Sequence, residues 1–173
     1  MISGLKQRTL FNTIPNPTDV VYTPAHVAKD IIDWVHPEGL CLDPCIGDGA
    51  FYNAMPPERD WCEIEQGRDF FEYTNHVDWI IGNPPYSIFE SFLSHSFSLS
   101  KNVVFLVPTN KIFQRKKIMT MINEFGGIKG MRIYGSGTSI GFPFGFSVGA
   151  FYFVRNYNGD ASVVLAPTCN PEI

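Results

Sequence analysis

Short apolar runs alternate with segments of helical periodicity along most of this chain. Runs rich in β-branched and aromatic residues are typical of buried strands, and apolar residues that recur every three or four positions are typical of helices. Strands are therefore predicted at 39–42, 61–64, 77–82, 103–107, 128–134, 148–154 and 162–166. Helices are predicted at 24–35, 87–99 and 111–125, with a shorter one after the glycines near residue 49. The alternation predicts an α/β fold whose sheet is mostly parallel and ends in an antiparallel hairpin.

The alternating pattern begins after residue 20, which predicts one domain preceded by an arm. Residues 1–20 are polar and contain prolines, so they are interpreted as an N-terminal arm, and 21–173 as a single domain. Thr23 is a residue type that caps helices, and Pro24 fits a first helical turn, so a helix is expected to begin there.

Composition indicates a well-packed globular protein, since 45% of the residues are hydrophobic and only 17% are charged. No apolar stretch approaches the ~20 residues that span a bilayer, and the N-terminus lacks the apolar core of a signal peptide. A cytoplasmic protein with no membrane partner is therefore expected. The four cysteines, which lie in predicted strands and loops, are interpreted as core thiols rather than as a zinc site, and no metal site is predicted: Cys41, Cys45, Cys62 and Cys169.

The formal net charge of −4 bears on possible partners. Neutralisation of phosphates supplies most non-specific affinity for DNA, so tight autonomous binding to duplex is disfavoured. A local basic rim remains compatible with this charge.

The most informative motif is Asn83-Pro84-Pro85-Tyr86, which follows the predicted strand at 77–82. The two prolines end the strand in a rigid, extended loop, and the carboxyl ends of strands in open α/β sheets are where ligands bind. Asn83 Oδ1 and the Pro84 carbonyl can accept hydrogen bonds from a planar amino-bearing group, while the Tyr86 ring stacks on it. A structural turn or a polyproline ligand is the alternative for an isolated motif of this kind.

A glycine-containing loop at 43–51 is the second motif. Gly47 and Gly49 permit a ligand to approach the backbone closely, and the loop lies between a predicted strand and a helix, as a nucleotide-type site requires. The spacing is not that of the dinucleotide fingerprint. Asp43, at the end of the strand, can pair with an ammonium group, which favours a cationic cofactor.

Acidic residues follow the next predicted strand. Glu63 is placed to accept hydrogen bonds from two ribose hydroxyls, with Glu65 as the alternative. Asp69 could accept from an adenine amino group, with Phe70 beside the ring. For each acid taken alone, a solvated surface position is the default interpretation.

Together these segments resemble the N6-adenine-specific DNA methyltransferase family. The loop from Asp43-Pro44 to Phe51 is similar to its cofactor loop, Asn83-Pro84-Pro85-Tyr86 to its catalytic loop, and Tyr22-Thr23-Pro24 to a segment that covers the methionine end of the cofactor. The resemblance implies a Rossmann-like methyltransferase catalytic domain that uses S-adenosyl-L-methionine to methylate adenine N6 in DNA after base flipping. The implied cofactor-binding residues are Tyr22, Thr23, Pro24, Asp43, Pro44, Cys45, Gly47, Gly49, Phe51, Glu63, Asp69 and Phe70.

Two departures from the family pattern matter. Only six residues lead from Glu63 to Asp69, where the family usually has a helix and a strand, so either one βα unit is missing or one assignment is wrong. No segment is long enough to be a target-recognition domain. A partner subunit or a homo-oligomer is therefore expected to supply recognition, or the specificity is relaxed.

Further residues are candidates for substrate binding besides Tyr86. Phe144 and Phe146 lie in a Gly/Phe-rich loop that resembles an aromatic wall of the base pocket, although core phenylalanines of a hairpin are the alternative. The run Lys111, Arg115, Lys116 and Lys117 could contact phosphates, although a solvated helix face is the default interpretation. Three other functions stay open: methylation of adenine N6 in RNA, methylation of glutamine in a protein, and a non-catalytic partner subunit with the same fold.

Overall fold

The computed structural model describes residues 20–166, and its centre is a sheet of seven strands. The predicted N-terminal arm, apart from Val20, and Cys169 lie outside the described residues. The spatial order of the strands is β2-β1-β3-β4-β6-β5-β7. Their bounds are β1 Cys41–Asp43, β2 Arg59–Trp61, β3 Val77–Gly82, β4 Ser100–Pro108, β5 Gly126–Ser136, β6 Ser147–Arg155 and β7 Ser162–Leu165.

The directions of the strands are those predicted from the sequence. β1, β2, β3 and β4 are mutually parallel, whereas β6 runs antiparallel to both β4 and β5. β7 adds a parallel strand beside β5. The sheet is thus mostly parallel on the side that holds the two motifs and closes on a hairpin at the other side.

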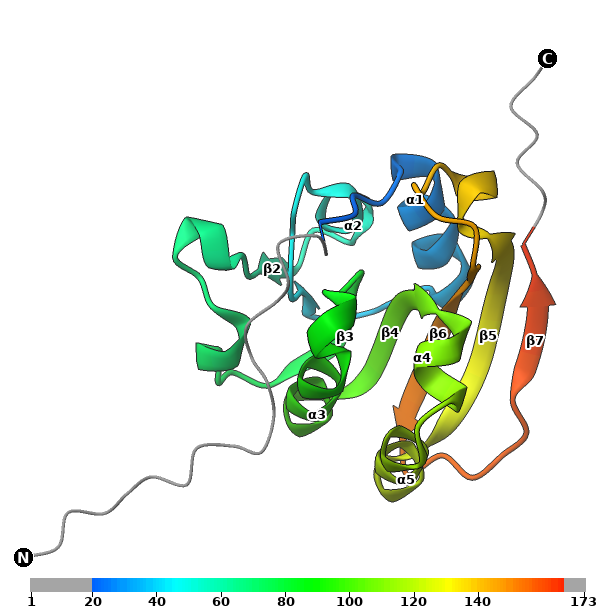
Figure 1. Cartoon of the computed structure of the whole chain (residues 1–173). Helices are drawn as coiled ribbons and strands as arrows, with labels where there is room; N and C mark the ends of the chain where they lie inside the picture. Colours follow the sequence, from blue (N-terminus) through cyan, green and yellow to red (C-terminus); the bar gives the residue numbers. More distant parts are fainter. Residues whose placement is uncertain (1–19, 167–173) are drawn as a thin grey trace, which may run out of the picture.

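Helices cover both faces of the sheet (Figure 1). α1 (Ala25–Val35) and α2 (Ala50–Ala54) pack on one face, while α3 (Phe89–Leu99) and α5 (Lys116–Phe125) pack on the other. Successive residues of a strand point to opposite faces, so Val103 and Phe105 of β4 join the core under α3, and Val104 and Leu106 join the core under α1. No helix of residues 20–166 is long and apolar enough to cross a membrane.

The segment between β2 and β3 contains no further strand. Two short 3-10 helices, η2 (Ile64–Gln66) and η3 (Phe70–Glu72), fill it, and β2 lies at the edge of the sheet. The βα unit that the spacing of Glu63 and Asp69 called into question is therefore not found in the described chain. β2 also ends at Trp61, two residues after it begins, so the strand predicted at 61–64 was placed too late.

The helix predicted over 111–125 is broken into α4 (Thr109–Phe113) and α5. Ile112 and Ile118 are both buried, yet in one continuous helix their side chains would point about 120° apart. Arg115 takes an extended conformation between the helices, which lets both isoleucines face the core. Thr23 does not cap α1, because the N-cap is Pro24 and no side-chain cap bond is made.

Candidate functional site

The two motifs meet at the carboxyl edge of the sheet, because β1 and β3 are adjacent, parallel strands. The thiol of Cys45 donates a hydrogen bond to the Asn83 carbonyl, with Sγ and O 3.2 Å apart. Gly82 permits this approach, since a Cβ there would lie 3.0 Å from Cδ of Pro44 and 3.2 Å from Oδ1 of Asp43. The glycine loop and the proline loop therefore form one site.

The amide of Asn83 is held in one orientation. Its Nδ2 donates to the Val21 carbonyl, 3.0 Å away. A carbonyl can only accept, so the amide nitrogen and not the amide oxygen must point toward Val21. Its Oδ1 is buried and, among residues 20–166, has no hydrogen-bond donor. A buried acceptor without a partner costs about 1–3 kcal/mol, so this oxygen marks a place where a donor from a ligand is expected.

A small pocket of about 30 Å³ lies between the segment at 21–23 and the glycine loop. The Tyr22 ring, 58% exposed, covers Gly47, where an added Cβ would lie 3.3 Å from the ring. The pocket is lined by Val21, Tyr22, Thr23, Cys45, Ile46, Gly47, Asp48, Ala50, Phe51 and Asn83. The pocket thus brings together four of the residues that the resemblance implies for cofactor binding: Tyr22, Thr23, Gly47 and Phe51.

A second pocket of about 50 Å³ lies on the other side of Cys45, which lines both. Pro44, Glu63, Asp69, Phe70 and Pro85 line it, together with Ile64, Phe71, Ile88 and Phe92. The Phe70 ring is fixed by stacking on Phe92, with centroids 5.0 Å apart. The pocket is therefore lined by both aromatic and acidic residues.

Both carboxylates of this pocket also hold the local backbone. Glu63 Oε2 accepts from Gly47 N–H at 3.0 Å, which ties the end of β2 to the glycine loop. Asp69 Oδ1 accepts from Phe71 N–H at 2.9 Å and so caps η3. Glu65 is exposed and does not line the pocket, so the geometry favours Glu63 as the ribose acceptor.

Asp43 lies beneath the glycine loop instead of facing either pocket. Its side chain is buried and its Oδ1 accepts from Cys45 N–H at 3.2 Å. Burial raises the pKa of this carboxyl to about 7, although the backbone N–H donors of Cys45 and Tyr52 oppose the rise. Asp48 is the acidic residue among those that line the pocket beneath Tyr22, whereas Asp43 shapes the loop.

The cysteines are buried or half-buried thiols in the described chain. Burial raises the pKa of Cys41 to about 11 and that of Cys62 to about 12, which keeps both protonated at neutral pH. Residues 20–166 hold no cluster of three or more His, Cys, Asp or Glu side chains that could bind a metal ion.

An aromatic cluster adjoins the proline loop. Tyr86 begins η4 (Tyr86–Ile88), and its ring meets Phe144 edge-on with centroids 6.1 Å apart. Phe144 stacks on Phe146 with centroids 4.0 Å apart. Phe144 thus lies beside Tyr86 as predicted, whereas Phe146 lies one ring further out.

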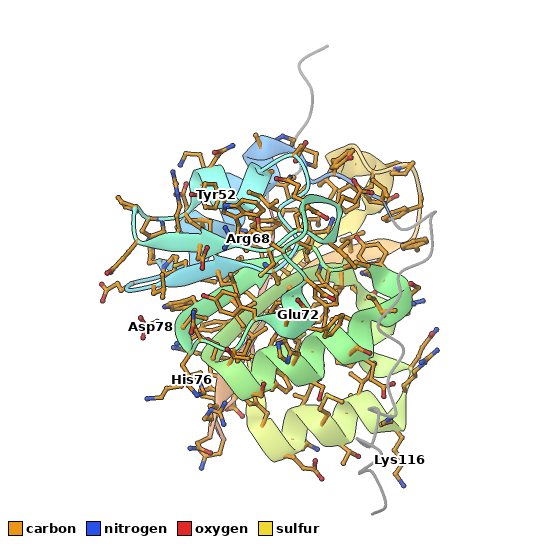
Figure 2. All side chains as sticks on the ribbon, turned by 90° about the vertical axis from the view of Figure 1, so that its left-hand side faces the viewer. Tyr52, Arg68, Glu72, His76, Asp78 and Lys116 are labelled. Atoms are coloured by element: carbon orange, nitrogen blue, oxygen red, sulfur yellow. The ribbon has the colours of Figure 1, made fainter. Side chains whose placement is uncertain are left out.

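The structure divides the basic run into two parts. Lys111 and Arg115 line a pocket of about 100 Å³ that Tyr86 also lines. Lys116 and Lys117 do not line it, and Figure 2 shows Lys116 at the end of α5, well away from the labelled Tyr52 and Arg68. Lys111 and Arg115 therefore line the pocket beside the candidate base site, and Lys117 reaches it through its ion pair with Glu90.

Some candidate residues support the site from a distance, and others were missed. Pro24 packs toward Gly141, and Gly49, at φ +89°, is the N-cap of α2; neither lines either of the two small pockets. The Val21 carbonyl could not be found from the sequence, because every residue has a backbone carbonyl. Asp48 is visible in the sequence as an acidic residue of the glycine loop. The prediction named Asp43 instead, because Asp43 lies at the end of the strand.

Comparison with solved structures identifies the fold. A proposed RNA methyltransferase from Pyrococcus horikoshii is 16% identical, with 79% of this chain and 83% of that chain covered and a TM-score of 0.57. The methyltransferase subunit of a type I restriction-modification system from Streptococcus thermophilus is 14% identical, with 84% and 47% covered and a TM-score of 0.62. The M protein of the type I restriction enzyme EcoKI is 12% identical, with 78% and 44% covered and a TM-score of 0.62.

The fold is thus the Rossmann-like fold of S-adenosylmethionine-dependent methyltransferases, as the sequence predicted. The chain spans less than half the length of the two type I subunits. Neither protein-family models nor curated protein sequences give a match to the chain.

Proposed function

We propose that this chain uses S-adenosylmethionine to methylate the N6 amino group of adenine in DNA. The observation that carries the proposal is the buried Oδ1 of Asn83, which lacks a donor within residues 20–166 while Nδ2 is fixed on Val21. An exocyclic amino group placed against this oxygen would supply the missing donor.

The residues around the two small pockets fit the cofactor. Gly47 leaves a cradle under Tyr22 that a Cβ would fill, and Asp48 faces it as a counter-ion for the ammonium group. Glu63 would accept from the ribose, and Asp69 and Phe70 would hold the adenine. S-adenosylmethionine, when bound, supplies an electrophilic methyl group.

The protein's part in the reaction is positioning and electrostatics. The lone pair of an aromatic amine is delocalised into its ring, so the nitrogen is a poor nucleophile. Hydrogen bonds from its N–H groups to Asn83 Oδ1 and the Pro84 carbonyl would favour a more tetrahedral nitrogen aimed at the methyl group. The Tyr86 ring would stack on the base and hold its amino group in line with the methyl donor, and the proton that the nitrogen loses on methylation would pass to water.

DNA is preferred as the substrate on three grounds. The order of motifs resembles the N6-adenine family, Tyr86 and Phe144 form an aromatic site beside Asn83, and two of the similar structures are type I restriction-modification subunits. A base in duplex would have to be flipped out to reach Asn83. We infer that a partner subunit or a second copy supplies target recognition, and that the reaction takes place in the cytoplasm, where Cys41 and Cys62 stay reduced.

The proposal is tested by incubating the purified protein with labelled S-adenosylmethionine and, separately, duplex DNA, single-stranded DNA, RNA and protein extract. Label in DNA is the expected result. Label confined to RNA or to protein would overturn the choice of substrate. Binding of S-adenosylhomocysteine by calorimetry with no transfer to any acceptor would favour a non-catalytic subunit.

A further inference from the structure

A row of aromatic rings leads from Tyr86, which meets Phe144 edge-on, to the surface at Phe146. Phe144 is half-buried and touches Tyr86, whereas Phe146 lies parallel to Phe144, with an angle of 8° between the rings, and is 47% exposed. One face of Phe146 is covered by Phe144. The other face is the part of this stack that a ligand can reach.

The loop that carries Phe146 is held in place by hydrogen bonds. The Phe146 carbonyl accepts from Gly137 N–H at 3.0 Å, and Ser136 Oγ donates to the Gly145 carbonyl at 3.2 Å. Phe144 packs so closely on Gly137 that a Cβ there would lie 2.7 Å from the ring. The exposed ring is therefore presented on an ordered support instead of a loose loop.

We propose that Phe146 is a stacking platform for the base next to the target adenine in an unpaired strand. This proposal rests on the proposed function and narrows its substrate to nucleic acid whose target region is single-stranded. Every base has a flat face, so an exposed ring in line with the Tyr86–Phe144 pair binds a neighbouring base without regard to sequence. The wall of the target pocket is then Tyr86 and Phe144, and Phe146 lies outside it.

The helix that begins beside this platform carries a cationic residue. Thr109 Oγ1, at the start of α4, donates to the carbonyl of Ser147, the residue that follows Phe146. α4 carries Lys111, which lines the pocket beside Tyr86. A strand whose bases stack on Phe146 and Tyr86 would thus pass a lysine suited to its phosphates, as binders of single strands require.

The test compares binding of a single-stranded adenine-containing oligonucleotide with that of the same oligonucleotide carrying abasic residues on both sides of the adenine. Phe146→Ala is expected to raise Kd for the intact strand about 5- to 100-fold, and Phe146→Trp to keep near-normal affinity. Wild type and Phe146→Ala should bind the abasic strand equally. Leu165→Ala, on the exposed face of β7, is the control and should change neither Kd.

An equal loss on both strands would overturn the proposal, because Phe146 would then contact the target base or support the fold. No loss on the intact strand would also overturn it. S-adenosylhomocysteine affinity of Phe146→Ala, expected to match wild type, separates misfolding from lost stacking. If binding depends on Phe146 and on the flanking bases as expected but no methyl group is transferred, the stacking role of Phe146 is retained and the proposed reaction is overturned.

Discussion

Asn83 shows how one backbone carbonyl can determine the chemistry of a side chain. An amide has one accepting and one donating end, and the Val21 carbonyl can bind only the donating end. Oδ1 is thereby turned into the site, where it is buried without a donor among the described residues. Substitution of Val21 by another residue would leave this carbonyl in place, so the contact depends on the path of the chain before α1.

Asp43 leads to a prediction about stability and pH. Its pKa is raised to about 7 by burial, from an ordinary value of 3.8 in the unfolded chain, so the native state binds the proton more tightly. The protonated carboxyl therefore contributes stability that is fully present below pH 4 and is lost as the pH rises through 7. One such group changes the free energy of unfolding by at most about 1.4 kcal/mol per pH unit.

Urea unfolding of wild type and Asp43→Asn between pH 4 and pH 8 measures this contribution. The difference in unfolding free energy between the two proteins is expected to shift steadily in favour of Asp43→Asn as the pH rises. Taking the difference removes the opposite contribution of Asp30, whose pKa is lowered by its bonds to Arg132 and Tyr134 despite partial burial. If the unfolding free energies of the two proteins follow parallel curves against pH, Asp43 does not titrate in this range.

At the scale of elements, the site depends on the close contact between the ends of β1 and β3. Gly82→Ala would place a Cβ 3.0 Å from the Pro44 ring and 3.2 Å from Asp43 Oδ1, so the two strand ends must move apart. We expect a loss of about 1–3 kcal/mol in unfolding free energy and a weaker affinity for S-adenosylhomocysteine, measured by urea unfolding and calorimetry. Gly145→Ala is the matched control, because its Cβ would meet only Ser136 Oγ, at 3.9 Å. If the two variants bind the ligand equally well, the contact between the strand ends is not needed for the cofactor site.

Sequence periodicity predicted elements well where burial is uniform along the element. β3 matches its predicted range, because its run of apolar residues is bounded on both sides by polar or proline residues. The break between α4 and α5 was missed, since Ile112 and Ile118 each fit a local helical pattern and only the sheet decides that both must be buried. β2 was misplaced for a related reason: its residues are half-buried, so the apolar signal lies in the turn that follows.

The candidate site was partly predictable for the same physical reason. Motifs after β1 and β3 could be placed together because parallel strands end at the same edge of a sheet. The depth of a residue below a loop leaves no trace in sequence, which is why the sequence did not show that Asp43 is buried and that Asp48 lines the pocket. Phe144 and Phe146 look equivalent in sequence, and only the stack shows which ring faces Tyr86.

At the scale of the whole molecule, an acidic protein carries a small basic region beside the proposed base site. The formal net charge is −4, while Lys111 and Arg115 line the pocket that includes Tyr86. Glu90 lies in the same pocket and pairs with Lys117, with Nζ and Oε1 2.5 Å apart, and more loosely with Arg115, at 3.9 Å. Electrostatic attraction of nucleic acid is therefore expected to be local and weak.

Lys111→Ala tests this local contact through the dependence of affinity on salt. Each phosphate contact that is lost lowers the slope of log K against log salt by about 0.7 for a single strand. Lys111→Ala should show that reduction for an adenine-containing oligonucleotide. Lys116→Ala, which removes the same charge outside the pocket, should leave the slope near that of wild type. Equal slopes for the two variants would mean that only the overall charge matters.

The proposed reaction is tested most directly by nucleoside analysis of an adenine-containing DNA. The DNA is first incubated with the protein and with S-adenosylmethionine that carries an isotope-labelled methyl group. Wild type is predicted to yield labelled N6-methyladenine, and Asn83→Ala to yield it at a rate lower by about 10²-fold or more, while still binding S-adenosylhomocysteine. Label on another atom or molecule, or an unchanged rate in Asn83→Ala, would contradict the claim that the buried oxygen of Asn83 receives the adenine amino group.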